Sequence, residues 1–175
     1  GAWNKGIKKA AEIGEIIVNT NEDLIFDASI NHFIDEIAGD CDRKKTVYGP
    51  LTNGVGKDAH PRQFSKNARN ENLLILTSKD LDKERPGLGG WAEILNGFFL
   101  GFTRDFYKSY SKEEKLFPLK HKYDRGDGKW GGQEVIMIEW AQNGAVCKVV
   151  PKCWINHTKF KSYRLARNYY KDGQL

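Results

Sequence analysis

The chain has 175 residues, of which 39% are hydrophobic and 12% aromatic, a composition that favours one globular domain over a disordered segment. Its longest apolar stretch, residues 94–102, is broken by asparagine and glycine and is much shorter than the ~20 residues of a membrane-spanning helix, so no membrane partner is expected. Three cysteines are too few for a disulfide framework, and they fit a reduced, cytoplasmic setting. The start at Gly1-Ala2 leaves open a leader that has been removed.

The formal net charge of +5 is unevenly distributed along the chain. Residues 1–40 hold three lysines and eight acidic residues, a net charge of −5. Residues 146–175 hold seven cationic residues and one aspartate, a net charge of +6. An acidic head and a basic tail predict a polarised surface that steers charged partners.

The acidic head, residues 1–40, has the periodicity of two amphipathic helices. Apolar residues from Ile7 to Val18 follow helical spacing, which predicts a helix over residues 5–18 with a weak point at Gly14. A second helix is predicted by four apolar residues at i, i+3, i+4 and i+7, namely Ile30, Phe33, Ile34 and Ile37. Asp27 or Ser29 can cap the start of this helix, and Gly39 can follow its end.

The middle of the chain alternates polar and apolar segments. Residues 41–72 are predicted to form a long polar loop. A loop of that length is unusual in a compact domain, so it is either functional or contains a short strand near Thr46–Tyr48. Residues 73–77 form an apolar run of strand length. A core helix is then predicted over about residues 89–110, from apolar residues three and four positions apart, namely Trp91, Ile94, Leu95, Phe98, Phe102 and Phe106.

The C-terminal third is predicted to start with a β-hairpin over residues 133–150. Two β-prone runs flank Asn143-Gly144, a dipeptide typical of a two-residue hairpin turn. Pro151 is expected to end the second strand, and residues 151–175 form the basic tail. Together these elements predict a single α+β domain, residues 1–175, with N-terminal amphipathic helices, a central hydrophobic helix and a small antiparallel sheet that includes the hairpin.

The basic tail combines cations with aromatic residues. Cations neutralise phosphates, and aromatic rings stack on unpaired bases. The sequence therefore predicts a nucleic-acid-interacting domain, with RNA favoured over DNA. The residues expected to make the contacts are Lys152, Lys159, Lys161, Tyr163, Arg164, Arg167 and Lys171. A solvated helix whose aromatic residues pack on the core would have the same composition, and the sequence leaves that alternative open.

Two other function classes are consistent with the sequence. His60-Pro61-Arg62 in the polar loop could serve a metal-independent ribonuclease of the small toxin type, with His60 as general acid or base and Arg62 stabilising the phosphorane charge. The second proton-transfer group that such an enzyme needs cannot be chosen from sequence. Alternatively, the acidic N-terminal region could meet a protein partner, as in a protein-interaction module.

No metal or cofactor is predicted. Cys147, Cys153 and His157 have the spacing Cys-x5-Cys-x3-His, but zinc sites have four ligands and closer cysteines, so structural cysteines are favoured, with a Cys147–Cys153 disulfide left open. Asp105 with Glu113 and Lys115 resembles the residue set of a metal-dependent nuclease without the rigid scaffold that such a site needs. No family motif is recognised.

Overall fold

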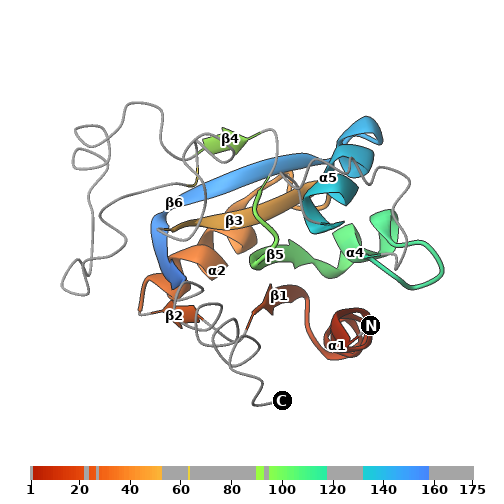
Figure 1. Cartoon of the computed structure of the whole chain (residues 1–175), viewed down its shortest axis with the longest axis horizontal. Coiled ribbons are helices and arrows are strands. Elements are labelled where there is room, and N and C mark those ends of the chain that lie inside the picture. Colours follow the sequence, from red (N-terminus) through yellow and green to blue (C-terminus); the bar gives the residue numbers. More distant parts are fainter. Residues whose placement is uncertain are drawn as a thin grey trace, which may run out of the picture.

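The computed structural model of the chain describes residues 2–21, 24–26, 28–52, 63, 90–92, 95–117 and 132–157. In chain order they form α1 (Ala2–Ile13), β1 (Ile16–Thr20), β2 (Leu24–Phe26), α2 (Ser29–Gly39), β3 (Thr46–Thr52), β4 (Gly90–Ala92), β5 (Phe99–Thr103), α4 (Arg104–Tyr110), α5 (Gly132–Gln142) and β6 (Val146–His157), as Figure 1 shows. Within these ranges no helix has the length and apolar character needed to cross a bilayer.

The strands form one sheet in the order β1-β5-β3-β6-β2, and β4 also pairs with β6. β3 and β6 run parallel, whereas the other strand pairs are antiparallel. The predicted α+β class is confirmed, but the sheet is mixed rather than antiparallel. Pro50 pairs with Val150 and Leu51 with Trp154, so residues 151–153 of β6 lie outside the β3 register and form a bulge.

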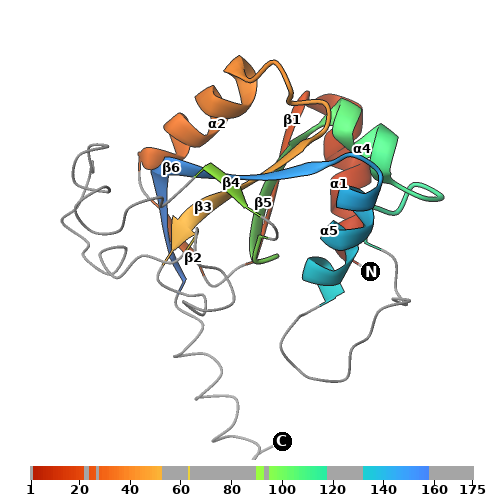
Figure 2. The same cartoon turned by 90° about the horizontal axis from the view of Figure 1, so that it is seen from above.

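Helices cover both faces of the sheet. α2 packs on one face, where its Phe33 is buried in a core together with Phe99 of β5 and Ile155 of β6. α1, α4 and α5 pack on the other face, where the core includes Phe106 and Trp140. Figure 2 shows α2 set apart from the group formed by the other three helices. Burial on both faces explains why all seven residues of β3 are buried and why its sequence does not alternate between apolar and polar residues.

The first predicted helix is wrong at its C-terminal end, because α1 ends at Ile13 and Ile16–Thr20 form β1 against β5. Gly14 follows the end of α1, and its carbonyl accepts hydrogen bonds of 3.0 and 2.9 Å from the Arg104 guanidinium. The segment that follows is β-branched, and its side chains alternate between the two cores, so strand pairing outweighs the helical spacing.

The second predicted helix is confirmed as α2, although its capping differs from the prediction. Ala28 is the N-cap residue and provides no side-chain hydrogen bond. The Ser29 hydroxyl instead accepts a 3.0 Å bond from the Trp154 N–H and donates a 3.3 Å bond to the Trp154 carbonyl, which ties α2 to β6. Gly39 is the last helical residue, and Asp40 is the C-cap.

The core helix predicted over about residues 89–110 is wrong except at its end, because this segment forms β4, β5 and the short helix α4. Phe98 and Phe102 belong to the cores on opposite faces of the sheet, so their four-residue spacing does not mark one face of a helix. The helix starts only at Arg104, where the Thr103 hydroxyl accepts a 3.1 Å bond from the Phe106 N–H and caps it.

The predicted hairpin over residues 133–150 is also wrong, because its first half is the helix α5. Gly144, with φ of 85°, is the left-handed residue that ends this helix. The Gly144 N–H donates to the Ala141 carbonyl and the Ala145 N–H to the Trp140 carbonyl, at 3.0 Å each, which is a Schellman motif. Asn-Gly therefore follows a helix here, and β6 continues through Pro151 to His157.

The short strand expected near Thr46–Tyr48 is confirmed and extends through Thr52 as β3. The strand predicted over residues 73–77 lies outside the described residues.

Candidate functional site

Of the residues predicted to bind nucleic acid, only Lys152 lies within the described ranges. It is exposed in the β6 bulge. The other six predicted contacts, and both His60 and Arg62, lie outside the described ranges, so the structure does not test whether they come together. The residues that the structure does describe form two hollows, one on each helical face of the sheet.

The first, which we call the α2–β6 hollow, has a volume of about 520 Å³ and includes Lys152. Its floor is an ion-pair network in which the Lys148 ammonium lies 2.8 Å from a Glu36 carboxylate oxygen and 2.9 Å from an Asp40 carboxylate oxygen. The second Asp40 oxygen accepts a 2.8 Å bond from the Asp42 N–H. The Asp40 side chain is only 9% exposed, so it depends on these partners for its charge.

The network shifts the pKa values of its members. Burial by itself raises the pKa of Asp40, but the hydrogen bonds from Lys148 and the Asp42 N–H outweigh it, and the pKa is lowered overall. Burial by itself lowers the pKa of Lys148, but Glu36 and Asp40 outweigh it, and the pKa is raised. Both groups are therefore charged at neutral pH. Burial, reinforced by Asp40, raises the pKa of Tyr48, which keeps that phenol neutral.

The charges of the α2–β6 hollow do not suit a phosphate. Three carboxylates, Asp35, Glu36 and Asp40, line it together with Lys148 and Lys152. Lys148 already occupies the position between two of these carboxylates. Asp40, Cys41 and Asp42 bring ligand atoms within 4.8 Å of one another, but Cys41 is exposed and nothing else in the structure points to a metal there. The charged groups that line the hollow are best explained as an internal ion-pair network that holds α2 on β6.

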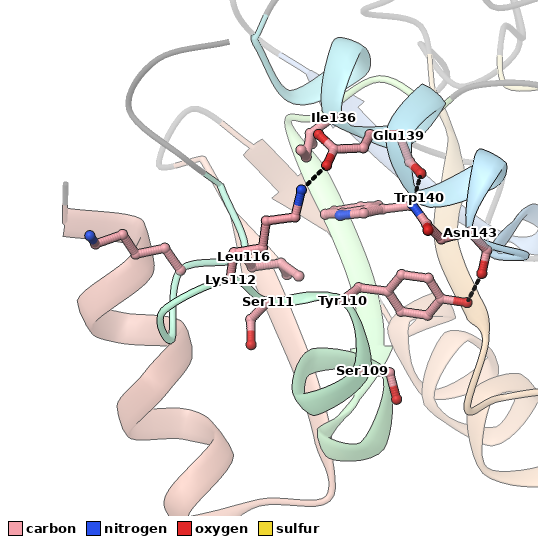
Figure 3. A pocket seen from close by; sticks show the side chains of 10 residues that line it. Ser109, Tyr110, Ser111, Lys112, Leu116, Ile136, Glu139, Trp140 and Asn143 are labelled. Carbon is pink, nitrogen blue, oxygen red and sulfur yellow. Dashed lines mark hydrogen bonds and ion pairs between the residues drawn. The ribbon is translucent and has the colours of Figure 1, made fainter. Parts of the chain in front are cut away.

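The second, the α4–α5 hollow, has a volume of about 300 Å³ and lies between the end of α4, the loop after it and α5 (Figure 3). Its position is fixed by packing at both ends. Phe106 of α4 meets Trp140 of α5 edge to face, with ring centroids 5.3 Å apart. The Asn4 side chain of α1 accepts a 2.9 Å bond from the Phe117 N–H and also donates to the Phe117 carbonyl, which fastens the end of the loop.

Aromatic and polar groups line the α4–α5 hollow together. The Tyr110 ring stacks on Phe106 with centroids 4.5 Å apart, and its hydroxyl donates to the Asn143 carbonyl at 3.4 Å. Figure 3 shows the Tyr110 ring face-on, below Trp140. Lys112 forms an ion pair with Glu139 across the hollow. Ser109, Ser111 and Lys115 complete the polar lining, and Leu116 and Ile136 supply apolar walls.

The Trp140 indole is a buried donor without an acceptor. The residue is only 3% exposed, and its Nε1–H has no hydrogen-bond partner in the part of the chain that is described. A buried donor left in this state costs about 1–3 kcal/mol. An acceptor that reached this N–H would remove that cost.

Two of the three cysteines belong to the hydrophobic cores, whereas Cys41 is exposed. Cys147 and Cys153 are free and buried, and they belong to the cores on opposite faces of the sheet. They therefore neither pair with each other nor point toward a common metal ion. Burial raises the pKa of the Cys147 thiol to about 12, so it carries no reactive thiolate at neutral pH.

The nuclease-like set is not assembled either. Asp105 lies 3.4 Å from the Lys44 ammonium, whereas Glu113 pairs with Lys115 at 3.3 Å. The two carboxylates thus have different partners. The α4–α5 hollow was not predicted from the sequence, because Trp140 was assigned to a strand. The four-residue spacing of Phe102, Phe106 and Tyr110 does indicate the aromatic wall that α4 contributes.

No protein-family model matches the chain, and the curated proteins contain no match to it. The α+β class is therefore established by the structure, and the function has to be inferred from the residues.

Proposed function

We propose that the protein binds nucleic acid, RNA in preference to DNA, through the cationic aromatic segment that begins within β6. The observation that carries the proposal is the net charge of +6 over residues 146–175, in which lysine and arginine alternate with phenylalanine and tyrosine. Cations of this kind neutralise phosphates, and the aromatic rings offer stacking surfaces for unpaired bases. Single-stranded RNA presents both targets at once.

The described residues support the proposal at its starting point. β6 pairs with β3 on one side and with β2 near its end, so the strand is anchored up to His157. Lys152 projects from the bulge of the same strand and is exposed, and no acidic partner pairs with it in the described part of the chain. Lys152 is thus an exposed cation at the start of the segment, although Asp35, Glu36 and Asp40 line the same hollow.

Filter binding of a short single-stranded RNA over a salt series tests the proposal. The affinity should fall steeply with salt, with a slope of about −0.7 per phosphate contacted. Replacing Lys161, Arg164 and Arg167 together by serine should weaken binding and flatten that slope. The matched control replaces Lys5, Lys9 and Lys44, which lie on exposed parts of the N-terminal half. Absence of binding at low salt, or equal losses in both variants, would contradict the proposal.

A ribonuclease activity at His60 and Arg62 is a second candidate, favoured by the position of the next described residue. Gln63 is fully buried, and its backbone carbonyl accepts a 2.9 Å bond from the Thr52 N–H at the end of β3. Its side chain accepts a 2.6 Å bond from the Asn96 N–H and donates to the Pro50 carbonyl at 3.3 Å. The residue that follows Arg62 in sequence is thus held on the sheet, and catalytic groups need such rigid support.

Incubation with total RNA in EDTA tests this second candidate. Cleavage without metal is expected from the intact protein and not from His60→Ala or Arg62→Ala. Cleavage that persists at full rate in the His60→Ala protein would remove the proposed role of this histidine.

A further inference from the structure

The α4–α5 hollow has an aromatic platform on one wall. One face of the Tyr110 ring stacks on Phe106, which is fully buried, so the opposite face of Tyr110 is directed away from the core. The Tyr110 side chain is partly exposed, and its hydroxyl is held by the Asn143 carbonyl. Burial raises the pKa of Tyr110, so the ring carries no charge at neutral pH. A ring fixed in this way offers a flat surface on which a planar ligand can stack without first ordering a side chain.

Donors for an acceptor-bearing ligand line the same hollow. The Trp140 Nε1–H is buried and unpaired within the described ranges, and Ser109 and Ser111 belong to the lining of the same hollow, although Figure 3 shows their hydroxyls directed away from Trp140. A planar ring that brings an acceptor to Trp140 would satisfy a donor that the folded chain leaves without a partner. A purely apolar ligand would fill the volume but leave that donor unpaired.

A cation stands at the edge of the hollow. Lys112 is engaged by Glu139, but Lys115 pairs only with Glu113, at 3.3 Å and with both side chains about half exposed or more. An exposed pair of this kind is weak, so the Lys115 ammonium can exchange it for an anionic group on a ligand. Each lysine of the lining already has a glutamate partner, so an anionic ligand would have to displace the weaker Lys115–Glu113 pair.

The loop that carries these lysines has a strained backbone, and contacts from α4 and α1 hold it in place. Glu113 and Glu114 have φ values of 50° and 60°, which side chains rarely adopt. The Tyr107 hydroxyl donates a 2.9 Å bond to the Glu114 carbonyl, and Lys8 of α1 forms an ion pair with the Glu114 carboxylate. Strain of this kind persists where the surrounding structure enforces it, and it is concentrated at ligand clamps.

From these observations we infer that the α4–α5 hollow binds one nucleotide unit, with its base stacked on Tyr110 and hydrogen-bonded at the Trp140 side and its phosphate at Lys115. A volume of about 300 Å³ is at the small end of the range for ligand sites and suits one such unit. The same chemistry could come from a free mononucleotide or from an unpaired nucleotide of a strand. The inference concerns described residues alone and holds whether or not the C-terminal segment binds nucleic acid.

Calorimetric titration of the full chain with AMP and UMP tests the site, with a single-stranded RNA pentamer as the second arm. Saturable binding of a mononucleotide is expected, and Tyr110→Leu should weaken it by at least about fivefold. Tyr110→Phe is the matched control: it keeps the stacking ring, and its affinity should stay within about twofold of the intact chain. Lys115→Gln should weaken binding, whereas Lys9→Gln, at an exposed i,i+3 pair on α1, should not.

The two sources are separated by comparing the arms. Equal affinity for AMP and for the pentamer, with both dependent on Tyr110, assigns the site to a free nucleotide. Much tighter binding of the pentamer, again dependent on Tyr110, assigns it to a strand. Thermal melting of each variant distinguishes lost binding from lost folding, and Lys115→Gln serves as the readout if Tyr110→Leu does not fold.

Failure of this inference is distinct from failure of the proposed function. If neither AMP, UMP nor the pentamer binds, or if Tyr110→Leu and Lys115→Gln both bind as the intact chain does, the inference is wrong. RNA binding that depends on Lys161, Arg164 and Arg167 but not on Tyr110 would contradict nucleotide binding in the α4–α5 hollow. The same result would support RNA binding by the C-terminal segment. AMP binding that persists after all three positions are replaced would show that the α4–α5 hollow binds a nucleotide independently of those residues.

Discussion

Gly101 of β5 lies directly against Phe33 and Ile37 of α2. A Cβ atom at this position would lie 2.3 Å from a Phe33 ring carbon and 2.7 Å from the end of Ile37. Both side chains are fully buried, so neither has space to retreat. The absence of a side chain at Gly101 therefore sets the distance between the helix and the sheet.

We predict that Gly101→Ala destabilises the protein by about 2 kcal/mol, because overfilling a packed core forces side chains out of their rotamers. Urea denaturation of both proteins would measure the difference. Gly6→Ala is the control: no atom lies within 4 Å of the added Cβ, and alanine favours the helical backbone, so a gain of about 0.5–1 kcal/mol is expected. Equal effects of the two changes would contradict the packing argument.

Asp40 should control part of the pH dependence of stability. Its folded pKa is lowered relative to the unfolded chain, so its contribution is present above the unfolded pKa and is lost as the pH falls through the folded pKa. We expect Asp40→Asn to cost about 2 kcal/mol at pH 7, the usual value of hydrogen bonds to a charged group. The difference from the intact chain should shrink as the pH falls from 5 toward 3.

Denaturation at a series of pH values would check this prediction, with Asp42→Asn as the control. Asp42 pairs with Lys45 at 3.1 Å between side chains that are about half exposed, so its replacement should cost about 0.5 kcal/mol or less. A difference between Asp40→Asn and the intact chain that does not change with pH would show that packing, and not charge, is responsible.

At the level of elements, the junction between α5 and β6 distinguishes two readings of the same dipeptide. A type I′ hairpin turn requires positive φ at both Asn143 and Gly144, whereas the Schellman motif requires it only at Gly144. In the structure Gly144 has φ of 85° and Asn143 is not among the residues with positive φ. Gly144→Ala should therefore cost about 1 kcal/mol, and Asn143→Ala, at an exposed position, less than about 0.5 kcal/mol. Similar large losses in both variants would favour a hairpin.

Sequence periodicity predicted the elements that bury one face and failed for those that bury both. The spacing of Ile30, Phe33 and Ile37 marks a single stripe, and α2 lies where that stripe predicts it. β5 is buried at all its positions, so Phe98, just before it, and Phe102 within it have a helical spacing although they belong to the cores on opposite faces. α5 was misread for a different reason, because its β-branched residues favour a strand locally and only packing makes them helical.

The candidate sites, like the misassigned elements, depend on tertiary packing that local sequence does not encode. Lys152 was predicted to contact nucleic acid; the structure describes it as exposed and does not test that contact. The proximity of Tyr110 and Trp140 depends on how α4 and α5 pack, and local sequence does not encode the angle between two helices. The Lys148–Asp40 pair joins residues 108 positions apart through the placement of α2 over β6. Such pairs follow from the whole fold and not from a motif.

At the scale of the molecule, charge within the described ranges is less polarised than the sequence implies. Two acidic residues of the head pair with cations from outside it: Glu15 with Arg43, and Asp40 with Lys148. Repulsion between the head and a nucleic acid is correspondingly reduced. The α4–α5 hollow, whose two lysines each pair with a glutamate, lies on the opposite face of the sheet from the α2–β6 hollow, where carboxylates outnumber lysines.

This arrangement predicts a preference for single strands over duplexes. Both the proposed C-terminal surface and the α4–α5 hollow use aromatic rings, which reach bases only when those bases are unpaired. A single-stranded RNA should therefore compete at least about tenfold better than a duplex with the same number of phosphates, since stacking contributes about 1–3 kcal/mol per base. Competition filter binding at one fixed salt concentration would measure the ratio. Electrostatic attraction alone would instead favour the duplex, whose phosphates are denser, and equal or better competition by the duplex would show that charge and not stacking governs recognition.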